Sequence, residues 1–208
     1  MGKDHWPTLH DDKYARLRLK RSCELLQAMP NHRILDVGCH QEEARQYLPA
    51  NSKYVGLDHI KGDNFDGGFN LHQKFDRILC LEVLEHLMYP KKTLKAISDH
   101  LEKDGIAVIS LPNEATLFHR IRSFLGTPDQ EAFSECGKHL HLPSMRQSKS
   151  FVSQEFQIAS LVPYESDGAG SAQQWMQPIL RCLPLKLLSI AWPSLFARGF
   201  IFMGKSIS

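Results

Sequence analysis

Short apolar runs alternate with amphipathic stretches along the chain. The runs are residues 34–37, 54–57, 77–81 and 106–111. Their length and their content of Ile, Leu and Val predict buried strands. Between them apolar residues return every three or four positions, as in 11–28, 42–48 and 91–103, which predicts helices with one buried face. Strands that alternate with helices indicate an α/β fold with a mostly parallel sheet.

The pattern is less regular in the second half of the chain. Residues 114–145 join an amphipathic stretch to a loop-like segment around two histidines, and we expect a lid-like insertion there. A helix is expected over 145–161, followed by a strand in VPYES. Residues 172–197 are apolar but contain three prolines and two basic residues, which predicts an interrupted helical segment and falls short of the roughly 18 apolar residues of a membrane span.

Two further segments complete the expected sheet. Residues 59–76 are rich in Gly, Asn and Asp and predict a loop around one short strand. GFIFMGK, residues 199–205, predicts a final strand that lies antiparallel at the sheet edge. The expected sheet therefore has seven strands.

Composition narrows the class of protein. With 208 residues, 42% hydrophobic and 23% charged, the chain fits a single globular domain over 1–208. A net charge of +2 argues against a dedicated nucleic-acid binder. The five cysteines form no CxxC pair and the first residues have no apolar core, so we expect a reducing compartment and a cytoplasmic location.

Charge around the first strand turn indicates the ligand. In open α/β sheets, nucleotides bind at the carboxyl ends of the strands. Here Asp36 precedes the turn residue Gly38, and Glu42 and Glu43 follow it. Carboxylates repel a pyrophosphate, which disfavours a dinucleotide-dependent oxidoreductase, and they suit an ammonium or sulfonium centre.

A second acidic position supports this interpretation. Asp58 ends the next strand 22 positions after Asp36, near the spacing at which an acidic side chain meets ribose hydroxyls. Ribose without phosphate, joined to an amino-acid-like cation, describes S-adenosylmethionine. With FDRILCLEVLEHL, these residues resemble the class I S-adenosylmethionine-dependent methyltransferases of the small-molecule type, similar to the ubiquinone-biosynthesis group.

The resemblance implies a Rossmann-like three-layer sandwich with a seven-stranded, mostly parallel sheet and an antiparallel edge strand. It implies a cofactor site at the strand ends and in the loop after the second strand. The implied residues are Asp36, Gly38, Cys39, His40, Asp58, Asn70, Leu81 and Glu82. Asn70 is expected against the adenine, with Asp63 and Asn64 as alternatives. Tyr14 or Arg16, on a helix that covers the cofactor in this family, could reach its carboxylate.

One departure from the family pattern stands in the first turn. The family commonly has GxGxG, whereas His40 and Glu42 replace the second and third glycines. A Cβ at His40 must then be accommodated where the backbone normally approaches the cofactor. This departure is the main support for an alternative, a catalytically silent methyltransferase-fold module that binds a partner.

Histidines are the candidate catalytic residues. If LEVLEHL is helical, Glu82, Glu85 and His86 share one face. His139 in GKHLHLPS matches the family's lid pattern, and His141 matches it less closely. We expect His86 and His139 to accept the acceptor's proton, because imidazole titrates near neutral pH. A partly buried His86 and an exposed loop His139 are the structural alternatives.

A metal stays open. Glu82, Glu85, His86 and His139 also resemble the ligand set of metal-assisted O-methyltransferases that act on ubiquinone precursors and on small-RNA ends. Such oxygen and nitrogen ligands would suit Mg²⁺, Mn²⁺ or Zn²⁺. Because many relatives with EVLEH lack a metal, we expect S-adenosylmethionine alone as the cofactor and leave the metal ligands unassigned.

The expected activity is methyl transfer to a hydroxyl or amine of a small or lipid-like acceptor. Asn113, just past a strand end, is either a substrate contact or a loop residue. The apolar segment 172–197 either packs on the core or touches a bilayer surface beside the basic residues of 119–122. The sequence specifies neither the acceptor nor the oligomeric state.

Overall fold

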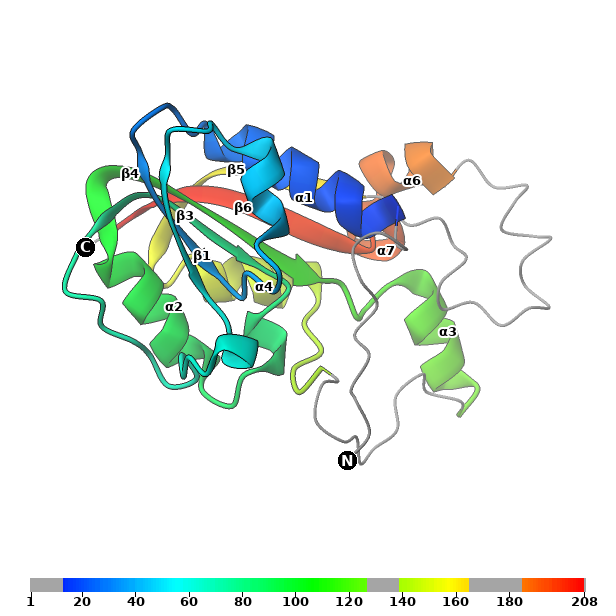
Figure 1. The fold of residues 1–208 in the computed structure, drawn as a ribbon. Helices are drawn as coiled ribbons and strands as arrows, with labels where there is room; N and C mark the ends of the chain where they lie inside the picture. Colours follow the sequence, from blue (N-terminus) through cyan, green and yellow to red (C-terminus); the bar gives the residue numbers. More distant parts are fainter. Residues whose placement is uncertain (1–12, 127–138, 165–184, 208) are drawn as a thin grey trace.

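A six-stranded sheet of order β2-β1-β3-β4-β6-β5 organises the protein (Figure 1). The computed structural model describes residues 13–126, 139–164 and 185–207. The strands are β1 (Arg33–Val37), β2 (Lys53–Leu57), β3 (Phe75–Leu81), β4 (Leu101–Pro112), β5 (Phe156–Tyr164) and β6 (Gly199–Ser206). β1 pairs in parallel with β2 and β3, and β3 with β4, whereas β6 is antiparallel to both β4 and β5.

Helices cover both faces of this sheet. The helices are α1 (Lys13–Leu26), α2 (Pro90–Asp99), α3 (Leu117–Phe124), α4 (Met145–Val152), α6 (Leu185–Ala191) and α7 (Pro193–Phe196), with 3₁₀ turns η1 (Glu43–Tyr47), η2 (His59–Lys61) and η3 (Leu84–His86). In Figure 1, α1 lies on one face and α2 and α4 on the other. The expected Rossmann-like architecture with helices on both faces is therefore present.

Strand residues alternate between the two core layers. In β4, Ala107 and Ile109 join the layer that contains Leu94 and Ile97 of α2, while Val108 joins the layer that contains Leu26 of α1. This period of two is the pleat of a strand whose faces are both covered. Burial of each large aliphatic side chain contributes about 1.5–3 kcal/mol, so both helical layers stabilise the sheet.

The sheet differs from the expected one in two ways. Residues 59–74 hold η2 and a loop instead of a short strand, because Gly62, Gly67 and Gly68 adopt positive φ and Asp66 accepts hydrogen bonds from the backbone of Met88 and Tyr89. The described sheet thus has six strands, and the expected seventh is not among them.

The last strand is antiparallel as expected, but its position differs. β6 lies between β4 and β5 instead of at the edge. Phe200, Ile201 and Phe202 are all fully buried. Three consecutive buried residues are typical of an interior strand with apolar layers on both faces.

Several expected helices are shorter in the structure. α4 begins with a capping box between Ser144 and Gln147 and ends at Val152, so the predicted helix over 145–161 is wrong beyond that point. β5 begins at Phe156, because its residues pair with β6. The helix expected over 42–48 is only the 3₁₀ turn η1, and the helix expected over 91–103 ends at Asp99.

The two irregular segments are described in part. Within 114–145 the structure contains α3, and residues 127–138 lie outside the described part of the chain. Within 172–197 it contains α6 and α7, and residues 165–184 lie outside it, as does VPYES beyond Tyr164. Among the helices that are described, none combines the length and apolar character that crossing a bilayer requires.

Candidate active site

The turn after β1 keeps a glycine conformation at three positions. Gly38, His40 and Glu42 have φ values of 77°, 46° and 63°. A Cβ on Gly38 would lie 2.2 Å from Cγ2 of Val83, so glycine is required there for space as well as for conformation. His40 and Glu42 adopt left-handed backbone despite their side chains, at a cost of about 1–2 kcal/mol each. The backbone of the turn therefore keeps left-handed φ values at His40 and Glu42, although these residues replace the family's glycines.

The side chains of His40 and Cys39 have different partners. His40 places Nδ1 2.9 Å from Oε1 of Glu43, beside η1. Cys39 is buried against Gly56 of β2, and burial raises the pKa of its thiol to about 11. The backbone N–H groups of Gly38 and Cys39 donate to the carbonyl of Leu57. The turn is thereby tied to the end of β2.

Asp36 is buried beside Tyr54, which the sequence pattern did not indicate as a site residue. The hydroxyl of Tyr54 donates to Oδ2 of Asp36 at 2.6 Å. Burial raises the pKa of Asp36 to about 7, although the Tyr54 hydrogen bond opposes the rise. Tyr54 lies two positions before Gly56, the β2 residue that pairs with Asp36, and sequence spacing alone does not reveal this proximity.

Asp58 stands at the end of β2 as expected, with both oxygens bound to the backbone. Oδ2 accepts from His40 N at 2.6 Å and Oδ1 from Ile60 N at 2.9 Å. Asp63, one alternative for the adenine contact, accepts from Asp58 N at 2.9 Å. Asp58 therefore joins the first turn to η2 and leaves only 3% of its surface exposed.

Asn70 lies apart from these residues. Its side chain accepts from His72 N, which is turn chemistry, and the next residue, Leu71, donates its N–H to His100. The carbonyl of His100 accepts from Phe75 N at the beginning of β3, whereas Leu81 ends that strand and Glu82 follows it. The structure does not bring Asn70 together with Gly38 and Asp58.

Glu82 is held by a cation from α1. Arg18 Nη1 lies 3.5 Å from Glu82 Oε2, and Ser110 Oγ donates to Oε1 at 2.9 Å. Glu82 itself adopts a left-handed φ of 55° directly after β3. Of the two α1 residues expected near the cofactor's carboxylate, Arg16 is exposed, and the side chain of Tyr14 lies outside the described residues. Among the described side chains of α1, Arg18 is the one that pairs with Glu82 at the end of β3.

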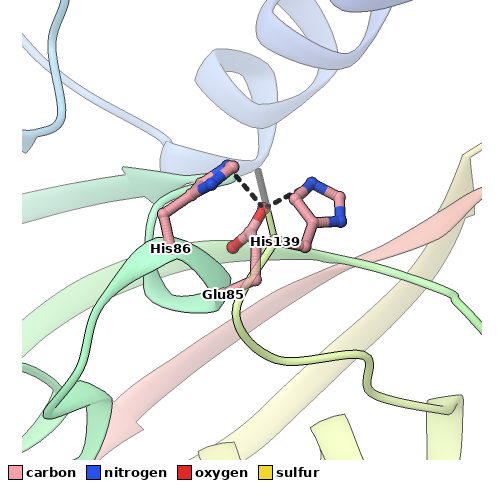
Figure 2. A group of neighbouring side chains, drawn as sticks. All are labelled: Glu85, His86 and His139. Carbon is pink, nitrogen blue, oxygen red and sulfur yellow. Dashed lines mark ion pairs between the residues drawn. The ribbon is translucent and has the colours of Figure 1, made fainter. Parts of the chain in front are cut away.

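Glu85 and His86 of η3 form a cluster with His139 (Figure 2). Oε1 of Glu85 lies 3.9 Å from Nε2 of His86 and 4.0 Å from Nε2 of His139. Both carboxylate oxygens are buried and have no hydrogen-bond partner within the described ranges. Burial, together with the charge of Glu82, raises the pKa of Glu85 well above its usual range.

The cluster offers oxygen and nitrogen ligands to a divalent cation. All three ligand atoms lie within 4.8 Å of one another. Bonds of about 2.1 Å to one ion place tetrahedral ligand atoms about 3.4 Å apart, so the three side chains would have to move closer together around an ion. The orphaned carboxylate supplies the negative charge that such an ion requires. Glu82, bound to Arg18 and Ser110, is not part of this group.

His141 and Asn113 have structural partners. Nε2 of His141 lies 2.9 Å from the carbonyl of Leu87, and its ring does not join the cluster. Asn113 is buried and donates to the carbonyls of Ser194 and Ala197. Asn113 therefore fastens α7 to the end of β4.

Comparison with known proteins identifies the family. A family described as "Methyltransferase domain" matches residues 10–154, more than half of the chain. The chain belongs to this methyltransferase family. A search of curated proteins finds no match.

Solved methyltransferase structures share the fold. The N-methyltransferase NodS from Bradyrhizobium japonicum WM9, in complex with S-adenosyl-L-homocysteine, has a TM-score of 0.61 at 12% identity, over 100% of this chain and 94% of that chain. Coclaurine N-methyltransferase, bound to N-methylheliamine and S-adenosylhomocysteine, has 0.57 at 14% identity, over 99% and 76%. The small RNA methyltransferase HEN1 has 0.61 at 14% identity, over 100% and 26%. At these identities the likeness concerns the fold.

Together these findings confirm the predicted class. The methyltransferase is an enzyme of the class I type, and its cofactor is S-adenosylmethionine. They assign no role to individual residues and no acceptor.

Proposed function

We propose that this methyltransferase transfers the methyl group of S-adenosylmethionine to a hydroxyl or amine of a small or lipid-like acceptor held beside Glu85, His86 and His139. The observation that carries the proposal is the buried Glu85 carboxylate, which has no hydrogen-bond partner in the described structure. A buried unpaired carboxylate costs several kcal/mol unless a ligand, an ion or a proton satisfies it. An acceptor that brings an O–H or N–H group would satisfy it.

The cofactor would lie over the ends of β1, β2 and β3. Gly38, packed on Val83, brings the first turn directly against the segment that carries Glu85. Asp58 retains lone pairs for the ribose hydroxyls, and Asp63 beside it is the favoured partner on the adenine side. Asp36 and Glu82 add negative charge near the methionine part, which suits its ammonium group.

The chemistry needs alignment and a proton acceptor. The acceptor's oxygen or nitrogen attacks the methyl carbon as the carbon–sulfur bond breaks, and S-adenosylhomocysteine leaves as a neutral thioether. The proton of the acceptor passes to Nε2 of His86 or His139. A divalent cation at Glu85, His86 and His139 would lower the pKa of a bound hydroxyl and so favour O-methylation.

Exposed apolar side chains support the lipid-like part of the proposal. Phe124 and Leu125 at the end of α3 and Leu187 and Ile190 of α6 are exposed, Phe124 by 89%. Both helices lie at the same end of the molecule in Figure 1, which is the end reached by the carboxyl end of β4. Exposed apolar side chains beside the basic residues of 119–122 favour contact with a membrane surface or a lipid.

The test is a methylation screen. Cell extracts incubated with methyl-labelled S-adenosylmethionine and the enzyme are separated into lipid and aqueous phases, and we expect a labelled product in the lipid phase. Label only in aqueous small molecules would remove the lipid-like acceptor, and no enzyme-dependent label in either phase would contradict the proposed activity. Repeating the assay with EDTA and then added Mg²⁺ or Mn²⁺ tests the cation.

A further inference from the structure

The carboxylate of Glu114, which no sequence motif indicated, lies against the ring of His139. Oε1 of Glu114 lies 2.7 Å from Nδ1 of His139. Glu114 follows the end of β4, 25 positions before His139. The ring of His139 therefore lies between two carboxylates, with Glu114 at Nδ1 and Glu85 toward Nε2.

The two distances assign the two ring nitrogens different roles. At 2.7 Å, a nitrogen and a carboxylate oxygen share a proton in a charge-assisted hydrogen bond. At 4.0 Å, Nε2 and Glu85 share no direct hydrogen bond. Because an ionised carboxylate only accepts hydrogen bonds, the proton belongs on Nδ1, and Nε2 of the neutral ring keeps its lone pair.

Glu114 is itself held in place. Its backbone N–H donates to the carbonyl of Pro143 at 3.0 Å. Its second oxygen lies 3.5 Å from Nε2 of His119, whose Nδ1 lies 2.9 Å from Oγ1 of Thr116, the N-cap residue of α3. Glu114 is thus an acceptor in a fixed position.

The main chain around His139 is fixed as well. The N–H groups of Leu140 and His141 donate to the carbonyl of Glu85 at 2.8 and 3.0 Å. These bonds set the position of the ring relative to Glu85, but they leave its rotation and its tautomer undetermined. The Glu114 hydrogen bond determines both.

We propose that Glu114 is a positioning residue that holds His139 in the Nδ1-protonated tautomer, with the Nε2 lone pair facing Glu85. The tautomer stands on the geometry alone, whereas its use for proton acceptance or cation binding rests on the proposed function. A carboxylate that orients a histidine in this way also makes the other ring nitrogen a better base or ligand. Its loss is expected to cost about 10- to 100-fold in turnover or cation affinity.

The tautomer is tested by NMR of the ring nitrogens. Long-range ¹H–¹⁵N spectra at about pH 8.5, where an unperturbed imidazole is neutral, identify the protonated nitrogen. We expect Nδ1-protonated His139 in the wild-type enzyme, assigned by its absence in His139→Gln. Glu114→Gln and Glu114→Ala should shift the ring toward the Nε2-protonated form. An Nε2-protonated ring in the wild type, or an unchanged ring in Glu114→Ala, would overturn the proposal.

Turnover and ligand titrations test the functional part. With the extract fraction that the wild type methylates, Glu114→Gln should lower kcat about 10- to 100-fold and leave the KM for S-adenosylmethionine unchanged. Glu102→Gln is the matched control, because Glu102 pairs with Arg33 near the opposite end of β4. Equal turnover in Glu114→Gln and Glu102→Gln would overturn the positioning role. A wild-type rate in His139→Gln, alongside the expected NMR shifts, would instead contradict the proposed function.

Discussion

Two acidic regions lie side by side at the strand ends, and their carboxylates differ in hydrogen bonding. In the turn after β1, Asp58 is bonded through both oxygens to backbone N–H groups, and Asp36 accepts from Tyr54. After β3, both oxygens of Glu85 are buried without a hydrogen-bond partner in the described structure. The first region is formed by the chain alone, whereas the second requires a further group to complete it.

The carboxylates of the two regions are held in place by different means. The first region is maintained by strained backbone at His40 and Glu42, compensated by local hydrogen bonds. The second is maintained by the desolvation of Glu85, which only a proton, an ion or a ligand relieves. We therefore expect substitutions in the first region to change stability and cofactor binding, and those in the second to change turnover.

The largest expected effect is in the second region. His86→Ala and His139→Ala should each lower turnover by about 100- to 10,000-fold, because each removes a candidate proton acceptor. S-adenosylhomocysteine should still raise the melting temperature of both variants. His141→Ala is the control, since its ring bonds to Leu87 O and does not join the cluster. Normal rates in both variants would remove the cluster from the chemistry.

The pH dependence of stability reports on Asp36. Its pKa is about 7 in the folded enzyme and near 3.8 when unfolded. Between these values the unfolded chain binds fewer protons than the folded one, so stability falls as pH rises from about 4 to about 7 and then levels off. At about 1.4 kcal/mol per pKa unit, Asp36 contributes at most about 4 kcal/mol to this fall.

Denaturant unfolding at several pH values checks this expectation. Asp36→Asn should flatten the curve, because the amide cannot ionise. Glu85→Gln is the comparison variant, since the raised pKa of Glu85 acts in the same direction. A wild-type slope in Asp36→Asn would show that Asp36 is ionised in the folded enzyme.

A smaller effect is expected at Gly38. Gly38→Ala introduces a Cβ 2.2 Å from Val83 and an unfavourable positive φ, which should cost about 2–4 kcal/mol of unfolding free energy and weaken S-adenosylhomocysteine binding. Adding Val83→Ala should recover the steric part of the loss and leave the conformational part. If Gly38→Ala unfolds at the wild-type denaturant concentration, the inferred close packing of Gly38 against Val83 is wrong.

The smallest change in stability is expected at Asp58. Asp58→Ala loses the cap of η2 and the bond to His40, at about 1–2 kcal/mol, and should abolish the thermal shift with S-adenosylhomocysteine. Asp66→Ala is a close control, because Asp66 also accepts from two backbone N–H groups, those of Met88 and Tyr89. A normal thermal shift in Asp58→Ala would argue against a ribose contact.

Apolar runs were sufficient to predict most of the sheet, but not its order. The runs that became β1, β2, β3 and the end of β4 are short and buried. The run after Phe156 fits a helix as well as a strand, and only its pairing with β6 decides between them. The interior position of β6 depends on apolar layers contributed by other segments, which a local pattern does not contain.

The same limit applies to the candidate site. The acidic turn and the EVLEH segment are contiguous, so the sequence displays them. Arg18–Glu82 and Glu114–His139 join residues that are far apart in the chain, and no spacing indicates them. Asn70 was selected from a resemblance, whereas its own turn chemistry and the neighbouring bond to His100 place it at the other end of β3.

The interior position of β6 also affects synthesis. While residues 199–206 are still inside the ribosome, β5 has no hydrogen-bonding neighbour among the described strands, and the edge of β4 that pairs with β6 is open. Two open strand edges on a nascent chain invite aggregation and favour chaperone binding. The strands β1 to β3, which position Asp36 and Asp58, pair without β6, and translation of β6 then joins β4 to β5.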